Sequence, residues 1–219
     1  MLGNDFDFKA KGVVRLKKNI ICPCTNTLSF EYEEEPDLDA NPQILETIFN
    51  GTFMSIACAS CGKLHKPEYR ITLNWKSKNL RLTALPELER GEFYMKKKEN
   101  MQNETVIGFP EMADRLSVIK DGLEPVVIET LKSYILAKAE ESYPDYDINA
   151  WYHSALSNGI EFHLDGIRQN EVAVMRIPLE MYDKTLDEFK KHPKKNIFAS
   201  LRVRTYLSVQ NLLRPDALK

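Results

Sequence analysis

Hydrophobic and polar residues alternate through much of the N-terminal half of the chain, a pattern typical of half-buried strands. The alternation predicts a hairpin from residues 11–21 (KGVVRLKKNII) and 27–32 (TLSFEY). It predicts further strands over residues 52–57, 69–75 and 80–84. The first half is therefore expected to be an antiparallel β region.

One short helix and two polar stretches interrupt these strands. Asn41 and Pro42 are typical of a helix start, and the apolar residues that follow stop at Gly51, so a short helix is predicted here. Residues 31–39 are rich in carboxylates but lack the spaced oxygens and the glycine of a calcium loop, which favours a solvated loop. Residues 90–104 are polar without apolar periodicity and are predicted to be a linker or exposed connection.

Helical periodicity follows this polar stretch. It predicts helices over residues 110–119 and 125–141, with Gly122 between them. The apolar stripe of the second helix is the clearer one and consists of Val127, Ile128, Leu131, Ile135, Leu136 and Ala139. These are expected to be packing helices.

Short alternating runs return after residue 144. Residues 148–155, 159–164 and 171–177 are separated by turn sequences containing Asn-Gly and Asp-Gly, which predicts an antiparallel meander. A helix over residues 178–191 and a mixed segment over residues 197–213 complete the chain.

Composition narrows the class of protein. The 219 residues hold 30 Lys and Arg against 32 Asp and Glu, a net charge of −2, so no global basic field favours nucleic acid or membranes. Residues 1–99 hold 15 bases and 14 acids, a net charge of only +1. The chain has neither a signal-peptide pattern at its start nor an apolar run of the ~20 residues that span a bilayer, so we expect a cytoplasmic protein with no membrane segment.

The chemically distinctive feature is a set of four cysteines in two close pairs, Cys22 with Cys24 and Cys58 with Cys61. Thiols stay reduced in the cytoplasm, which favours metal ligation over disulfides. A zinc ion takes about four ligands at tetrahedral corners, and two knuckles can supply two thiolates each. The sequence therefore predicts one structural Zn²⁺ held by these four cysteines.

The two knuckles differ in length. Two residues separate Cys58 from Cys61, and Gly62 follows, whose freedom to take a positive φ suits a knuckle. Only Pro23 separates the first pair, and Thr25 stands where a glycine would be expected. Either both cysteines of the first pair bind the metal, or His65 replaces one of them as the fourth ligand.

Several motifs together resemble the CpXC family, which is named for its cysteine-proline-x-cysteine motifs and is uncharacterised in function. IICPC at residues 20–24 resembles the first motif with one residue lost, and NGTF leading to CASCG at residues 58–62 resembles the second without its proline. GFPE at residues 108–111, and GLE before VIETLK at residues 127–132, are similar to its helical part. The resemblance covers residues 20–141 and implies a zinc-ribbon-like domain followed by helices; it brings no catalytic residues.

Together these features predict an α+β fold. Residues 10–142 are expected to form a CpXC-like zinc-ribbon domain with two following helices. Residues 143–219 are expected to form a C-terminal α+β region, with an antiparallel meander and a helix.

A binding role is favoured over catalysis. Four protein ligands leave a zinc ion no open position for a substrate. The sequence has no glycine-rich phosphate loop, nucleophile elbow or histidine-glutamate zinc helix. A thiol redox role for Cys58 and Cys61 is a minor alternative, because such a pair is expected at the start of a helix.

A second set of metal-ligand residues lies in the predicted meander. His153 and His163 flank a predicted turn near Glu161, and two histidines with a carboxylate can form an open metal site. Ordinary surface or core histidines are the commoner role.

The predicted role is a zinc-stabilised binding or adaptor module for a protein partner. The alternative is a nucleic-acid-associated zinc-ribbon protein, with Tyr69 and Trp75 as stacking surfaces. The basic residues that favour this alternative are Arg15, Lys17, Lys18, Lys190, Lys191, Lys194, Lys195, Arg202 and Arg204.

Overall fold

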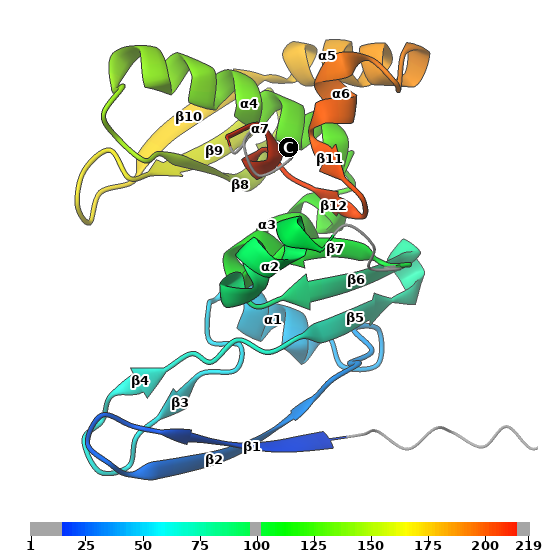
Figure 1. Ribbon diagram of the computed structural model, residues 1–219. Helices are drawn as coiled ribbons and strands as arrows, with labels where there is room; N and C mark the ends of the chain where they lie inside the picture. Colours follow the sequence, from blue (N-terminus) through cyan, green and yellow to red (C-terminus); the bar gives the residue numbers. More distant parts are fainter. Residues whose placement is uncertain (1–14, 97–101, 214–219) are drawn as a thin grey trace, which may run out of the picture.

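The computed structural model describes residues 15–96 and 102–213. Its elements are stacked in three tiers along the molecule (Figure 1). We call them the ribbon tier, made of β1 to β4; the middle tier, a mixed sheet with helices; and the C-terminal tier, a three-stranded sheet with helices. The predicted α+β class is confirmed.

The ribbon tier consists of two antiparallel hairpins. β1 (Arg15–Ile21) pairs with β2 (Thr27–Glu33), and β3 (Ile56–Ala57) pairs with β4 (Leu64–His65). The first predicted hairpin is confirmed from Arg15 onward, and residues 11–14 of that prediction lie outside the described residues.

The segment between the hairpins departs partly from the prediction. The short helix is confirmed as α1 (Gln43–Phe49), but the strand predicted over residues 52–57 forms only at its last two residues. The N–H groups of Thr52 and Phe53 both donate to the Thr47 carbonyl, at 2.9 and 2.8 Å. The strand prediction is wrong here because these residues complete the turn that ends α1.

The middle tier is built on a mixed sheet with the strand order β11-β12-β7-β6-β5. Its strands are β5 (Ile71–Trp75), β6 (Leu80–Leu85), β7 (Glu104–Ile107), β11 (Arg202–Val203) and β12 (Tyr206–Leu207), and single turns η1 (Lys76–Lys78) and η2 (Glu87–Glu89) flank β6. β7 runs parallel to both β6 and β12, whereas β5 with β6 and β11 with β12 are antiparallel. The strands β5 and β6 confirm the sequence prediction. The sheet thus combines strands from the N-terminal half of the chain with β11 and β12 from its last twenty residues. The predicted boundary between two domains at residue 142 stays a prediction.

The prediction of a linker over residues 90–104 is wrong at both of its ends, and residues 97–101 of that prediction lie outside the described residues. Its first residues form α2 (Arg90–Met95), and its last residue begins β7. Arg90 and Phe93 lie one turn apart and are both buried. The Arg90 guanidinium donates to Glu111 at 2.8 Å, so a residue that polarity alone would place at the surface packs inside.

The two predicted helices are confirmed, and they lie between the middle and C-terminal tiers. α3 (Phe109–Lys120) contacts β7 and β8, and α4 (Pro125–Ser142) contacts β8. Both helices have a proline in the first turn, where its missing N–H costs no hydrogen bond. Gly122 separates them with a φ of +73°.

The C-terminal tier confirms the predicted meander and the helix that follows it. Its elements are β8 (Asn149–Leu156), β9 (Gly159–Asp165), β10 (Ala173–Pro178), α5 (Leu179–Lys191), α6 (Asn196–Ser200) and α7 (Gln210–Leu213). Ile160 and Phe162 on β9 are fully buried in a core shared with α4. Among the described residues, no helix is both long and apolar enough to cross a bilayer.

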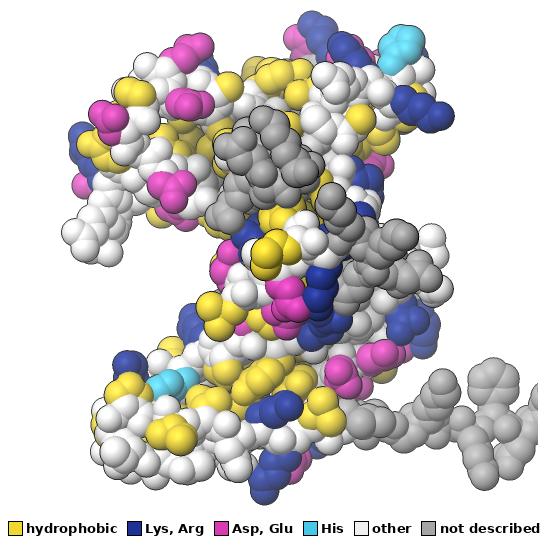
Figure 2. All heavy atoms as spheres, in the orientation of Figure 1, with side chains coloured by type: hydrophobic (Ala, Val, Ile, Leu, Met, Phe, Trp, Pro, Cys, Tyr) yellow, Lys and Arg dark blue, Asp and Glu magenta, His cyan; other side chains and the backbone are white. Residues whose placement is uncertain are grey.

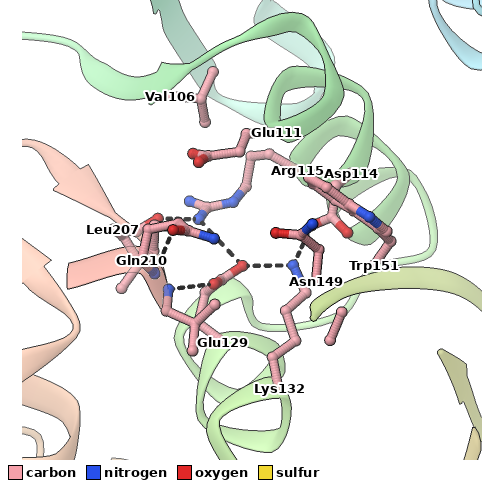
Figure 3. A pocket seen from close by; sticks show the side chains of 13 residues that line it. Val106, Glu111, Asp114, Arg115, Glu129, Lys132, Asn149, Trp151, Leu207 and Gln210 are labelled. Atoms are coloured by element: carbon pink, nitrogen blue, oxygen red, sulfur yellow. Dashed lines mark hydrogen bonds and ion pairs between the residues drawn. The ribbon is translucent and has the colours of Figure 1, made fainter. Parts of the chain in front are cut away.

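A buried ion network joins the middle and C-terminal tiers (Figure 3). Lys132 on α4 donates to Asp114 on α3 at 2.5 Å and to Glu129 at 2.8 Å. Asp114 also accepts the N–H of Tyr152 on β8, and Glu129 accepts the N–H of Val209 near the C-terminus. Four separate parts of the chain therefore meet at one set of charges.

The network is structural in character. Burial disfavours the charged form of Lys132, but the two carboxylates outweigh this effect and raise its pKa. The cavity beside these side chains has a volume of about 20 Å³, which suits one water molecule and no substrate.

We predict that Lys132→Met destabilises the protein by about 3–5 kcal/mol, because it leaves the buried Asp114 without its cation and leaves Glu129 with only Arg115, whose guanidinium is 3.9 Å away. Denaturant unfolding measures the loss. Lys138→Met, at an exposed position of the same helix, is the control and should change stability by less than about 0.5 kcal/mol. Equal effects of the two substitutions would contradict the assigned role of the network.

Candidate metal centre

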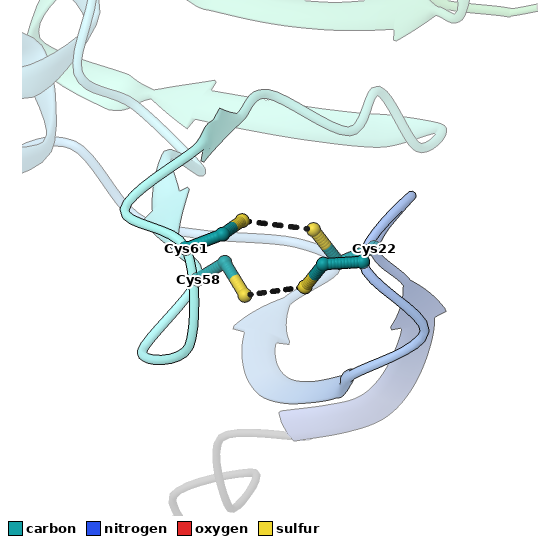
Figure 4. A group of neighbouring side chains, drawn as sticks. Cys22, Cys58 and Cys61 are labelled. Carbon is teal, nitrogen blue, oxygen red and sulfur yellow. Dashed lines mark hydrogen bonds between the residues drawn. The ribbon is translucent and has the colours of Figure 1, made fainter.

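The four cysteines converge at the end of the ribbon tier (Figure 4). The Sγ atoms of Cys22 and Cys61 are 3.6 Å apart, and those of Cys24 and Cys58 are 3.5 Å apart. All four Sγ atoms lie within 4.8 Å of one another. Tetrahedral zinc with sulfur at ~2.3 Å needs sulfur atoms ~3.8 Å apart, so the arrangement suits a single metal ion.

Two similar knuckles position these thiols. In the first, between β1 and β2, the Thr25 N–H donates to the Cys22 carbonyl at 2.8 Å. In the second, between β3 and β4, the Gly62 N–H donates to the Cys58 carbonyl at 2.8 Å. The first knuckle spans one residue fewer, and its turn is correspondingly tighter.

The residue that closes each knuckle has a left-handed backbone conformation. Thr25 has a φ of +72° and Gly62 has a φ of +74°. A β-branched residue rarely takes this left-handed conformation, because its Cβ crowds the backbone. The first knuckle therefore holds local strain that the second avoids.

The two buried cysteines, Cys22 and Cys58, differ in the pKa of their thiols. Burial disfavours the Cys58 thiolate, but N–H groups of Cys61 and Ser60 and the amide of Asn26 outweigh it and lower the pKa to about 6. At Cys22 a backbone hydrogen bond from Cys24 favours the thiolate, yet burial and the neighbouring thiols prevail and raise the pKa to about 12. Hydrogen bonds thus favour the thiolate form of Cys58 over that of Cys22.

His65 lies beside the four cysteines, but its ring is not placed close enough to all four sulfur atoms to belong to the ligand group. Its Nε2 is 3.2 Å from the Sγ of Cys22, but it is not among the atoms that lie mutually within 4.8 Å. Asn26 has a similar place on the other side, where its amide donates to the Cys58 Sγ at 3.6 Å. The sequence indicated His65 only as a substitute ligand and did not indicate Asn26. The position of Asn26 directly after the first knuckle was the one sequence feature that could have indicated its role.

The surroundings of the cysteines disfavour a dithiol redox site. Cys58 follows β3 and a turn leads to β4, so the pair does not lie at the start of a helix, which is where a thioredoxin-like redox pair is expected. The ribbon end has little other core: Cys22, Leu28 and Cys58 are its buried hydrophobic residues, with Ile20 and Ile56 partly buried against them. Two of the three buried residues of this local core are therefore the cysteines themselves.

The second candidate set also converges. His153, Glu161 and His163 place their ligand atoms within 4.8 Å of one another on the C-terminal sheet. This group lies in a different tier from the cysteines.

Comparisons with known proteins agree with the motifs. The model of the CpXC family, described as CpXC protein, matches residues 20–132. An uncharacterized protein of Treponema pallidum (strain Nichols) is 27% identical over 212 residues, which covers 87% of this chain and 96% of that protein. No solved structure matches the chain significantly.

We predict that Thr25→Gly stabilises the protein by about 1 kcal/mol, because glycine takes a positive φ without crowding. The midpoint of thermal unfolding measures the gain. Thr27→Gly is the control: Thr27 lies in β2, where glycine only adds freedom to the unfolded chain and should lower the midpoint. A loss of stability in both variants would show that the Thr25 backbone is not strained.

Proposed function

Because this chain belongs to the CpXC family and its four thiols converge, we propose that it binds one structural Zn²⁺ and that the zinc-bound ribbon docks on a protein partner. The proposed ligands are Cys22, Cys24, Cys58 and Cys61. The observation that supports them is the mutual distance of the four sulfur atoms, which is close to that of a tetrahedral site.

The donor set favours zinc and a structural role. Four thiolates select soft or borderline metals such as zinc and disfavour magnesium or calcium. A site with four protein ligands is closed to substrate. The ribbon end has a very small core, so metal binding would supply much of the free energy that keeps it folded.

We predict one zinc ion per chain in protein purified without a histidine tag, measured by elemental analysis. Cys24→Ser should weaken zinc binding by at least about 100-fold, since it removes a ligand, whereas His65→Ala should weaken it by less than about 10-fold. The reverse ranking would make His65 the fourth ligand. Less than half an equivalent of zinc, with four reactive thiols, would count against the site.

Exposed apolar residues beside the knuckles support a protein partner. Ile21, next to Cys22, is 77% exposed, and Leu64, three residues after Cys61, is 54% exposed. Figure 2 shows hydrophobic side chains at the surface of the ribbon end. Apolar side chains held out by a rigid metal knuckle are suited to burial against another protein.

Charge and aromatic packing give less support to nucleic acid. Arg15 and Lys17 on β1 lie directly opposite Glu33 and Glu31 on β2, so their charges are matched locally. The Tyr69 ring stacks on Tyr32 with centroids 5.2 Å apart.

Two other residues of the nucleic-acid alternative are already engaged. Trp75 is only 7% exposed and is not available for stacking on bases. The Arg204 guanidinium donates to the carbonyls of Phe93 and Lys96.

We predict that the wild-type protein retains a specific partner from its own cells and that Ile21→Ser with Leu64→Ser loses it. Leu88→Ser is the control, because Leu88 is 97% exposed but is remote in sequence from the cysteines. Mass spectrometry identifies the retained chain. Binding to duplex or single-stranded oligonucleotides that weakens steeply with salt would instead favour the nucleic-acid alternative.

A further inference from the structure

The sheet of the C-terminal tier has one face packed on helices and one face that carries polar side chains. Ile160 and Phe162 of β9 point into the core and are fully buried. Glu161 and His163 alternate with them and therefore share the opposite face. This opposite face holds the second group of candidate metal ligands.

A β-bulge adds a third ligand to that face. Tyr152 lies opposite Phe162 and Ser154 lies opposite Glu161, so His153 is an extra residue between two regular pairs. A bulge redirects side chains and often occurs next to functional sites. Here it puts His153 beside His163, with ring centroids 3.8 Å apart and an interplanar angle of 14°.

One oxygen of Glu161 faces both imidazoles. Its Oε1 is 3.3 Å from the Nε2 of His163 and 3.8 Å from the Nε2 of His153. Its other oxygen, Oε2, accepts a hydrogen bond from the Nε of Arg176 at 2.8 Å. The guanidinium thus holds the carboxylate in place and leaves Oε1 for a metal, an arrangement typical of ligands supported by a second layer of hydrogen bonds.

The group is accessible from solvent. The side chains of His153 and His163 are 50% and 31% exposed, whereas that of Glu161 is 12% exposed. His153 also lines an open groove of about 580 Å³ between α3 and β8, together with Trp151 and Asp165. An ion held by the three side chains would have coordination positions free for water or for a ligand in this groove.

From this geometry we propose that His153, Glu161 and His163 form a second, open metal site for a divalent transition ion such as Zn²⁺. Two imidazoles and one carboxylate are a donor set of open zinc and iron sites, and imidazole ligands disfavour Mg²⁺ and Ca²⁺. The site is independent of the cysteine cluster in ligand type and location.

The test uses the full chain and Zn²⁺ alone as the probe. Protein is dialysed against metal-free buffer, so that only tightly held zinc remains, and is then titrated with Zn²⁺ by calorimetry. We expect the wild type to bind one further equivalent. His163→Ala and Glu161→Gln should each weaken this binding by at least about 10-fold. Mg²⁺ in place of Zn²⁺ should give no saturable binding.

Control variants distinguish zinc binding at the two sites, and thermal unfolding tests whether the variants are folded. His192→Ala removes a histidine that follows α5 and should bind Zn²⁺ as the wild type does. Cys58→Ser should lower the tightly held zinc while the titrated equivalent remains, so failure of one site is distinguishable from failure of the other. Thermal midpoints close to the wild type show that His163→Ala and Glu161→Gln are folded.

A spectroscopic measurement locates the bound ion. Zn²⁺ should shift the imidazole nitrogen resonances of His153 and His163 and leave those of His192 unchanged. No further equivalent in the wild type, or equal binding in His163→Ala and His192→Ala, would overturn the proposal.

Discussion

Lys132 joins the two larger tiers, because its ammonium group lies between carboxylates that come from different helices. Each carboxylate also accepts a backbone N–H, Asp114 from β8 and Glu129 from the C-terminal segment. Buried charges are stable only while all their partners are in place. The positions of α3, α4, β8 and the C-terminal segment are therefore mutually dependent, and separating the tiers would leave several charges unpaired at once.

The ribbon tier is held by a different kind of interaction. Large apolar clusters fill the other tiers, whereas the ribbon end has a few buried residues around Cys22 and Cys58. Small β units of this kind usually need a metal or disulfides in place of a hydrophobic core. The strained Thr25 fits this view, since a tightly bound ion could hold a backbone conformation that local sequence disfavours.

Long periodic segments were predictable from the sequence, and short or charged ones were not. The stripe on α4 and the alternation of β8 to β10 each repeat often enough to indicate the element. β7 has four residues and β12 has two, which is too few for a pattern. α2 was missed because its buried residue Arg90 is charged, and burial of a charge depends on partners distant in sequence.

In the candidate sites too, local features were predictable from the sequence and features that depend on distant residues were not. The spacing of the cysteines was enough to predict their convergence, because ligand identity and knuckle length are local properties. The positions of Asn26 and His65 around the sulfurs depend on how two hairpins meet, which no local pattern encodes. The alternation of β9 places Glu161 and His163 together, but the bulge that brings His153 beside them depends on strand register.

The parallel pairing of β12 with β7 affects how the chain is made. Thr105 and Thr205, whose hydroxyl groups are 2.8 Å apart, are separated by 100 residues. At ~5–20 residues per second, the ribosome needs about 5–20 s to synthesise that interval. During this time one edge of β7 has no partner strand, and Arg115 lacks the Leu207 carbonyl to which it donates. Until β12 has been made, the nascent chain therefore exposes a sheet edge that can pair with other chains.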